Sequence, residues 1–185
     1  MGIIAIVRRI KNNLDKKHIK SVGVGFSIGQ NSTIIGGDSI IIGDDFHAGS
    51  RLKLQVWNKH NNSHVMEDYD ALLQIGDSVS FMENVMVSCV SQITIGDGVL
   101  LGDNVFISDN LHGKTGEQID LPPLERKLFV KGPIVIEDNV WIGRNACIMG
   151  NVCIGKGAII GANAVVTHDV LPNTVVAGVP AKEIV

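Results

Sequence analysis

Histidine and cysteine are the side chains of this sequence that could act as bases, nucleophiles or metal ligands near neutral pH. The chain has six histidines and three cysteines. His112 has the most suggestive position, because it directly precedes a long segment without periodicity. A neutral imidazole there could accept a proton from a substrate near pH 7. An exposed histidine in a turn is the plainer alternative.

The remaining candidates suggest structural roles. His60 and His64 are four residues apart, a spacing that aligns two metal ligands only on a helix, and no third ligand accompanies His112. We therefore expect no metal. The cysteines are odd in number and form no CxxC motif, which predicts structural thiols in a reducing compartment. We interpret His18, His47 and His168 as solvated or structural histidines. The three cysteines are Cys89, Cys147 and Cys153.

Composition indicates that strands hold these residues. The chain of 185 residues fits one domain. It contains 24 Ile and 22 Val against 12 Leu, and β-branched side chains favour strands over helices. This composition therefore disfavours a helical bundle.

A six-residue repeat predicts how the strands are arranged. Neither a helix nor simple strand alternation has this period, whereas a triangular coil of three short parallel strands does. One apolar residue opens each repeat, and a second apolar residue follows four positions later. The first set is Ile136, Ile142, Ile148, Ile154, Ile160 and Val166, and the second set is Val140, Ala146, Val152, Ala158, Ala164 and Val170.

The repeat is also present earlier, with interruptions. Ile75 and Ile95 are 20 residues apart, which predicts one coil plus a two-residue bulge. Ile28, Ile35 and Ile42 are seven apart and predict looser corners. Residues 51–70 break the pattern altogether, and residues 113–135 form an insertion of 23 residues with three prolines. We predict that this insertion is a functional loop that projects from a corner.

Charge excludes some partners. The net charge is −3, which gives no electrostatic basis for binding nucleic acid. The basic residues 2–18 could form an amphipathic helix. We predict that residues 1–20 form a helical cap that covers the first coil of a domain spanning residues 21–185. Contact of this helix with anionic lipid is the alternative. No apolar run is long enough to span a bilayer, so we expect a cytoplasmic protein. Attachment at the inner face of the membrane is the alternative location.

Several segments resemble a known superfamily. They are the hexads themselves, residues 106–113 (FISDNLHG), residues 122–123 with 131–134, residues 140–143 (VWIG) and residues 176–182. Over about residues 22–182 the chain resembles the hexapeptide-repeat acyltransferases. The most similar group is the sugar O-acetyltransferases, which includes galactoside and maltose acetyltransferases and enzymes that modify capsule and O-antigen. The resemblance implies an all-β fold, a left-handed parallel β-helix with a short N-terminal helix and a long loop insertion.

The resemblance also implies a reaction. An acetyl group passes directly from acetyl-CoA to a sugar hydroxyl, in a surface polysaccharide or its precursor, with His112 as general base. Asn84 corresponds to an asparagine that contacts the acceptor, although a stacked corner asparagine is an equal alternative. Asp109 could orient His112, but capping of a turn is the favoured interpretation. The rival functions are N-acetylation of an amino sugar or another small acceptor, and a hexapeptide scaffold without catalysis. The contacts that select the acceptor are expected to come from residues 51–70 and 113–135.

The donor site implied by the resemblance lies between two subunits of a homotrimer, near the C-terminal coils. Lys182, with Arg144 or His168, would meet the phosphates. Arg144 stands where a small residue is common and His168 where lysine is common, and Trp141 could instead fill a coil face. The matching positions are Trp141, Gly143, Arg144, Ala162, Thr167, His168 and Lys182.

Overall fold

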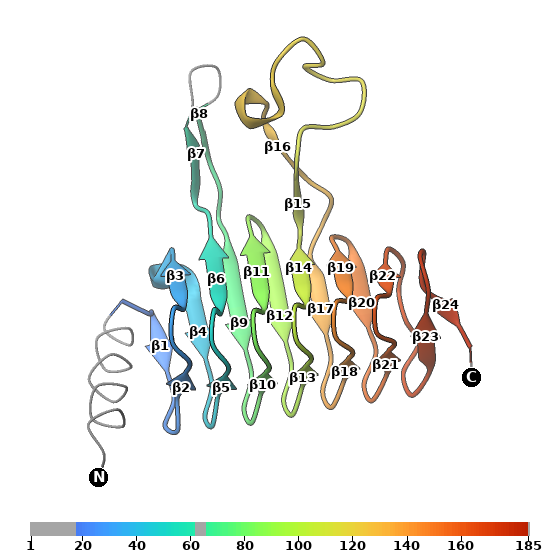
Figure 1. Cartoon of the computed structure of the whole chain (residues 1–185). Coiled ribbons are helices and arrows are strands. Elements are labelled where there is room, and N and C mark those ends of the chain that lie inside the picture. The colour runs from blue at the N-terminus through green and yellow to red at the C-terminus, as the bar shows by residue number, and fades with distance from the viewer. Residues whose placement is uncertain (1–17, 62–65, 185) are drawn as a thin grey trace.

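The chain winds into a three-sided coil of short strands (Figure 1). The structure, a computed structural model, describes residues 18–61 and 66–184. Each side of the coil is a sheet in which strands of successive coils pair in parallel. The parallel coil predicted from the hexads is therefore confirmed.

Three sheets form the sides. Sheet 1 consists of β1 (Ser21–Val22), β4 (Ile40–Ile42), β9 (Leu72–Ile75), β12 (Gln92–Ile95), β17 (Ile134–Ile136) and β20 (Val152–Ile154). Sheet 2 consists of β2 (Ser27–Ile28), β5 (His47–Ala48), β10 (Ser80–Phe81), β13 (Leu100–Leu101), β18 (Trp141–Ile142), β21 (Ile159–Ile160), β23 (Val175–Ala177) and the antiparallel β24 (Lys182–Glu183). Sheet 3 consists, in spatial order, of β22 (Val165–Val166), β19 (Cys147–Met149), β14 (Phe106–Ser108), β11 (Met86–Cys89), β6 (Lys53–Val56) and β3 (Thr33–Ile35).

The hexad residues form the core, because each strand turns alternate side chains inward. Ile75, Ile95, Ile136 and Ile154 pair in register along sheet 1, and all are buried. The second apolar set, from Val140 to Val170, is also buried. Near the N-terminal end aromatic rings fill core positions of both sets: the Phe46 ring lies 5.8 Å from the Phe26 ring of the coil before it and 5.1 Å from the Phe81 ring, which occupies the hexad position of β10.

All the extra residues leave the coil at one corner, between sheet 3 and sheet 1. The prediction of seven-residue spacing in the first coil was wrong: Ile34, not Ile35, pairs with the buried Leu54. The hexads continue through Ile34, and the additional residues form η1 (Gly37–Ser39) at that corner. The bulge between Ile75 and Ile95 occupies the same corner in a later coil.

Both long interruptions project from this corner as antiparallel hairpins (Figure 1). Residues 51–70 do not break the pattern altogether, because β6 belongs to the coil and Leu52, Leu54 and Val56 are buried. The hairpin itself pairs β7 (Lys59–Asn61) with β8 (Met66–Asp68). The second interruption begins before residue 113, because β15 (Asn110–His112) pairs with β16 (Leu128–Val130). Between these two strands lies η2 (Pro123–Glu125).

The other two corners are held by ladders of polar side chains. Between sheets 1 and 2, Asp138 accepts a hydrogen bond from the Asp97 N–H, and this bond, together with Lys156, lowers the pKa of the Asp138 carboxyl. Between sheets 2 and 3, the side-chain amides of Asn84, Asn104, Asn145 and Asn163 form a chain of hydrogen bonds of 2.8–3.0 Å. These asparagines all have positive φ, which asparagine tolerates better than most residues.

The predicted N-terminal helix concerns residues outside the described part of the chain, apart from the exposed His18. Among residues 18–61 and 66–184, no helix has the length and apolar character needed to cross a membrane.

The asparagine ladder generates a stability prediction at Asn104, which has a φ of 58° and bonds to a neighbour on each side. Asn104→Ala should lower the free energy of unfolding by about 1–3 kcal/mol, because it loses both amide bonds and forces alanine into the left-handed region. Asn104→Gly, which loses only the bonds, should cost less. Urea denaturation of the three proteins measures both effects. Equal loss in the two variants would show that backbone strain contributes nothing.

Candidate active site

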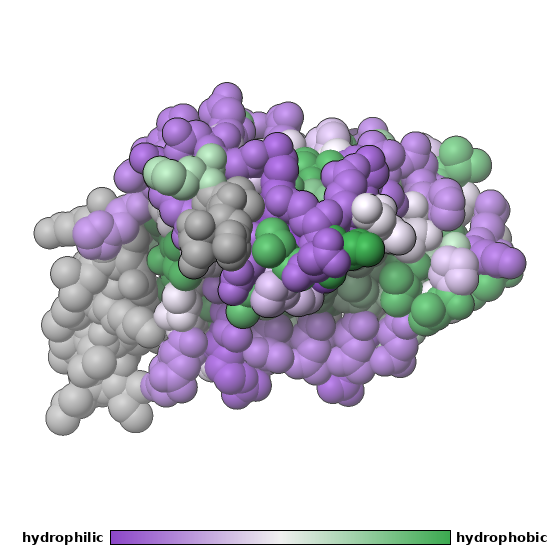
Figure 2. Space-filling view, turned by 90° about the horizontal axis from the view of Figure 1, so that it is seen from above, coloured by the Kyte–Doolittle hydropathy of each residue, from purple (hydrophilic) through white to green (hydrophobic). Residues whose placement is uncertain are grey.

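The outward face of sheet 3 is unusually apolar for a surface. Met86, Phe106 and Cys147 are adjacent in register, and Ser88, Ser108 and Met149 form the next row toward the hairpins. The residues between them, such as Ile107, face the core. Figure 2 looks down on the hairpins and shows hydrophobic residues in the hollow beside their largely hydrophilic outer surface.

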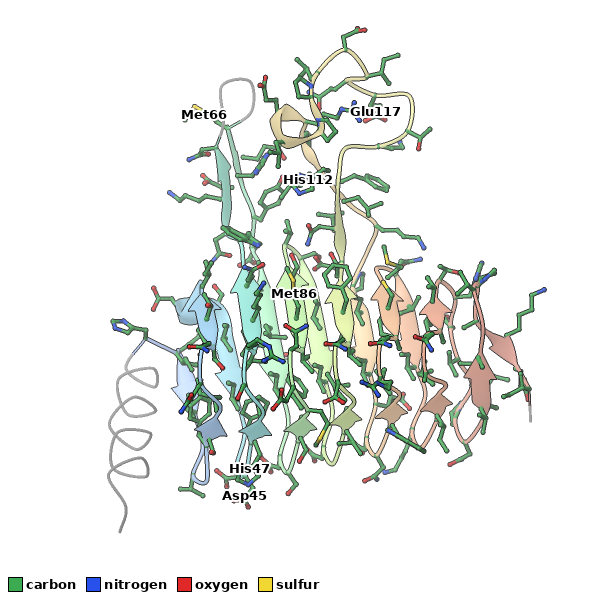
Figure 3. The ribbon with its side chains drawn as sticks, viewed as in Figure 1. Asp45, His47, Met66, Met86, His112 and Glu117 are labelled. Carbon is green, nitrogen blue, oxygen red and sulfur yellow. The ribbon has the colours of Figure 1, made fainter. Side chains whose placement is uncertain are left out.

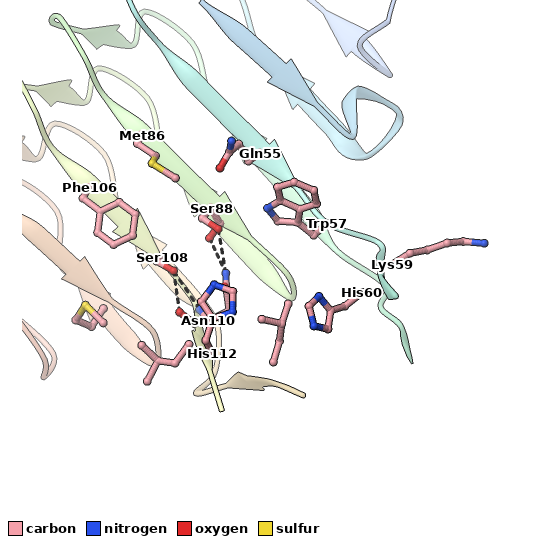
Figure 4. A pocket seen from close by; sticks show the side chains of 13 residues that line it. Gln55, Trp57, Lys59, His60, Met86, Ser88, Phe106, Ser108, Asn110 and His112 are labelled. Carbon is pink, nitrogen blue, oxygen red and sulfur yellow. Dashed lines mark hydrogen bonds between the residues drawn. The ribbon is translucent and has the colours of Figure 1, made fainter. Parts of the chain in front are cut away.

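A groove of about 430 Å³ lies where this face meets the two hairpins (Figure 4). It contains both apolar side chains and polar groups that can form hydrogen bonds, as ligand sites usually do. The lining residues are Gln55, Trp57, Lys59, His60, Met86, Ser88, Phe106, Ser108, Asn110, Leu111, His112, Leu128 and Met149.

His112 is part of this groove, but not from the position predicted. We expected it on a coil corner; it instead ends β15 and pairs with Leu128 of β16. Its side chain is exposed and lies between the two hairpins, above the coil (Figure 3). The hairpin stem therefore carries the imidazole beyond the end of sheet 3.

The root of this stem is fixed by Asp109, which is fully buried. Its carboxylate accepts hydrogen bonds from the backbone N–H groups of Val90 (2.9 Å) and Ser91 (2.8 Å) in the preceding coil. The capping interpretation of Asp109 is thus confirmed. Unpaired buried amides are costly, so this carboxylate stabilises the point where the second insertion leaves the coil.

Asn110 connects the stem to the coil surface. Its side-chain amide donates to the carbonyl oxygen and the hydroxyl of Ser88, both at 3.2 Å. The Ser108 hydroxyl donates to the Asn110 carbonyl oxygen at 3.0 Å. These bonds place a strip of polar groups within the otherwise apolar groove (Figure 4).

The cysteines have the properties of structural thiols. Cys89 is buried, and its burial, followed by the nearby Asp109 carboxylate, raises the pKa of its thiol far above the usual range. Burial also raises the pKa of Cys147 and Cys153. A thiol held protonated is a poor nucleophile, and no cysteine pair is bonded among the described residues.

Side-chain bonds join the two hairpins. Lys127 of the second insertion forms an ion pair with Glu67 of β8 at 2.5 Å, and Tyr69 donates to the same carboxylate at 2.9 Å. His60 Nε2 lies 3.2 Å from the carbonyl oxygen of Arg126. We call Glu67, Tyr69 and Lys127 the hairpin clasp. It lowers the pKa of Glu67, chiefly through the Lys127 bond.

The first hairpin and the strand before it contribute to the groove through residues that were not singled out from the sequence. Residues 51–70 were expected to supply acceptor contacts, and Gln55, Trp57 and His60 of this stretch line the groove. The signal was present, because Leu52, Leu54 and Val56 alternate with Lys53, Gln55 and Trp57 and thus predict which set faces outward.

Asn84 is placed elsewhere. Its side-chain amide donates to Asn104 at 2.9 Å in the corner ladder, and it does not line the groove with His112. The ladder alone gives Asn84 a structural role at this corner. Its contact with an acceptor stays a prediction.

The predicted donor residues fall on two edges of the coil. Gly143, Arg144 and Ala162 lie on the edge that carries the asparagine ladder, and the half-exposed Trp141 lies beside it on sheet 2. A Cβ on Gly143 would lie 2.7 Å from the Ala162 nitrogen, so close stacking of coils alone requires glycine here. Arg144 pairs with Asp103 at 3.8 Å and stays largely exposed.

Thr167 and His168 follow β22 at the corner from which the second hairpin projects two coils earlier. The Thr167 hydroxyl bonds to His168 Nδ1 at 2.9 Å, and Lys131 Nζ donates to the Thr167 carbonyl oxygen at 3.4 Å. Lys182 and His168 share a small pocket at the C-terminal end. The two edges therefore do not form one site within a single chain.

No metal centre is apparent in residues 18–61 and 66–184, where no three His, Cys, Asp or Glu side chains are arranged to hold an ion. His64 lies outside these ranges.

Comparisons with known proteins agree with the repeat. Residues 133–168 match the model for the bacterial transferase hexapeptide (six repeats). The chain is 31% identical over 148 residues to WbbJ of Escherichia coli K12, named as a lipopolysaccharide biosynthesis O-acetyl transferase, covering 78% of this chain and 70% of that protein.

Solved structures share the fold. The hexapeptide-repeat acetyltransferase VCA0836 of Vibrio cholerae, complexed with acetyl coenzyme A, has a TM-score of 0.59 at 25% identity and covers 96% of this chain and 76% of its own. AntD, an N-acyltransferase from Bacillus cereus, has a TM-score of 0.75 at 19% identity, covering 94% and 87%. The likeness to AntD concerns the fold alone.

The hairpin clasp can be tested through Tyr69, the sole tyrosine of the chain. Burial and the bond to Glu67 raise its pKa from the ordinary tyrosine value of 10.0 to about 12. The phenol therefore contributes stability that is complete below pH 10 and is lost as the pH rises through about 12. Ultraviolet absorbance should show tyrosinate forming near this pH while circular dichroism still reports a folded coil.

Tyr69→Phe is the matched control, because it removes the phenolate signal and the alkaline loss of stability together. A midpoint near the ordinary tyrosine value in the folded protein would contradict the clasp.

Proposed function

The chain belongs to the hexapeptide-repeat acyltransferases, a superfamily of left-handed parallel β-helices, and on that premise we propose that it is an acetyl-CoA-dependent O-acetyltransferase acting on a sugar hydroxyl. The proposed acceptor is a surface polysaccharide or its precursor. The observation that supports this most is the exposed imidazole of His112 within a groove of mixed apolar and hydrogen-bonding character. The similarity to WbbJ favours an oxygen acceptor.

In the proposed reaction His112 is the general base. It removes the proton of the acceptor hydroxyl while that oxygen attacks the carbonyl carbon of the thioester. As the tetrahedral intermediate collapses, the carbon–sulfur bond breaks, and the coenzyme A thiolate takes the proton back from the imidazolium. The products are an acetyl ester and free coenzyme A, with no covalent enzyme intermediate.

The distribution of the donor candidates supports an assembly. Gly143, Arg144 and Ala162 share their edge with Asn84, whereas His112 lies with Thr167 and His168 across sheet 3. A second chain that lays its asparagine edge against the groove would bring both sets to one acetyl-CoA. In a closed trimer each subunit supplies one edge and receives another, which gives three equivalent sites.

The basic side chains near the C-terminal end suit the phosphates of the donor. Lys131, His168 and Lys182 lie around the last coils, and backbone groups near Ala162 are available to pantetheine amides. Trp141 offers an exposed ring beside the same edge. These residues are the proposed donor site.

N-acetylation of an amino sugar is the second candidate. AntD shows that the fold serves nitrogen acceptors, but no carboxylate lines the described groove to receive an ammonium group. The oxygen acceptor is therefore the better-supported choice.

The base is tested by His112→Ala. Turnover, measured as thiol release from acetyl-CoA, should fall by about 10²–10⁴-fold, because the hydroxyl loses its proton acceptor. Calorimetric titration should show acetyl-CoA affinity nearly unchanged. His47→Ala, which changes an exposed histidine on sheet 2 of an early coil, is the matched control and should keep full activity.

If the wild-type protein fails to bind acetyl-CoA, the scaffold alternative replaces the enzyme. If it binds and His112→Ala retains full turnover, another group is the base.

The assembly is tested by light scattering. We expect a particle of three times the 19.8 kDa chain mass at working concentration, because the outward face of sheet 3 leaves apolar area that a neighbour can cover. A monomer that is fully active would rule out a donor site shared between chains.

A further inference from the structure

We propose that the root of the β7–β8 hairpin is the acceptor subsite, in which a pyranose ring without an amino group stacks on the indole of Trp57. The inference rests on the proposed function and specifies the class of its acceptor and the end of the groove where that acceptor binds.

The order of strands in sheet 3 separates the two ends of the groove. The order is β22, β19, β14, β11, β6, β3, and the stem that carries His112 leaves directly after β14. The proposed donor residues Thr167 and His168 follow β22, on one side of this stem. Trp57 follows β6, on the other side. The base therefore stands between the donor end and the end occupied by Trp57.

The chemistry of that end fits a sugar. A pyranose ring has an apolar face of C–H groups and a rim of hydroxyls, so it needs a flat apolar surface bordered by hydrogen-bonding groups. Trp57 lines the groove with 36% of its surface exposed. Gln55 lies beside it in the same groove (Figure 4), and within residues 18–61 and 66–184 its side-chain amide has no hydrogen-bond partner. The hydroxyl of Ser88 completes the polar border.

The lack of acidic side chains in the described part of the groove sets the class of sugar. Lys59 lines it with its ammonium group 3.9 Å from the Asp68 carboxylate, but Asp68 is not a lining residue, and among the described residues no carboxylate lines the groove. Glu67, which lies close by on β8, is already paired with Lys127 and bonded to Tyr69. A neutral or carboxylated pyranose is therefore compatible with this end, whereas an ammonium group would enter without a partner.

The subsite is also held in place before any ligand binds. The hairpin clasp ties β8 to the second insertion, and the His60 ring bonds to the Arg126 carbonyl oxygen. A surface that is ordered in advance loses less entropy on binding. The clasp thus keeps Trp57 at a fixed position relative to the stem of His112.

The two tryptophans of the chain make the inference directly measurable. In Trp141→Phe the emission comes from Trp57 alone, and in Trp57→Phe it comes from Trp141 alone. We would titrate both full-length variants with methyl glucopyranoside, methyl galactopyranoside, methyl glucuronide and glucosamine. The first three sugars, or a subset of them, should change the emission of Trp57 saturably. Glucosamine should bind more weakly, and the emission of Trp141 should not respond to any sugar.

Kinetics provide the second test. Trp57→Ala should raise the acceptor KM by about tenfold, as expected for loss of an aromatic stacking surface, and should leave the KM for acetyl-CoA within about twofold. Trp57→Phe keeps a flat ring and should recover most of the loss.

The outcomes separate this inference from the proposed function. If no sugar perturbs Trp57, or if Trp57→Ala turns over with an unchanged acceptor KM, the subsite is wrong while the acetyltransferase stands. If light scattering shows that Trp57→Ala changes the assembly, Trp57 is a subunit contact and the subsite is again wrong. If the wild type releases no thiol with any acceptor but sugars still perturb Trp57, the proposed function fails and the sugar subsite stands.

Discussion

The stacking of one coil on the next is the constraint on which the rest of this molecule depends. Each strand pairs with the strand 16, 18 or 20 residues away wherever no long insertion intervenes, so its inward side chains must repeat at the same positions in every coil. Extra residues within a strand would shift one face out of register. They can leave only at a corner, and in the described part of the chain they leave at the same one.

The regular part of this arrangement could be predicted from the sequence because it is local and periodic. The hexads from Ile136 onward identified both the coil and its core. The prediction failed where two registers were equally apolar: Ile34 and Ile35 both suit an inward position, and only pairing with Leu54 decides between them. His112 was found by its place before the insertion, but its hairpin stem depends on β16, whose pairing with β15 spans the insertion and has no periodic signature. Trp57 was not singled out, although the alternation of residues 52–57 indicates that its side chain faces outward.

The site therefore combines two sources of order. The coil supplies a flat apolar face and a buried carboxylate, Asp109, that fixes where the stem leaves it. The hairpins supply the imidazole, the indole and the polar groups around them, and are held to each other by an ion pair rather than by a shared core. Acetyl transfer by the proposed route uses both, since most of the proposed donor residues belong to the coil, whereas His112 and Trp57 belong to the insertions.

Placing both insertions at one corner makes acceptor recognition an exchangeable property of the fold. The residues that keep successive coils together, from the buried isoleucines to the corner ladders, lie outside the two hairpins. Hairpins of other lengths and sequences could replace them without changing the period of the coil, because each coil contacts only its neighbours. On the proposed function, divergence at this corner would alter which acceptor is modified and leave the acyl donor unchanged, so the same corner is also the place to graft new specificities.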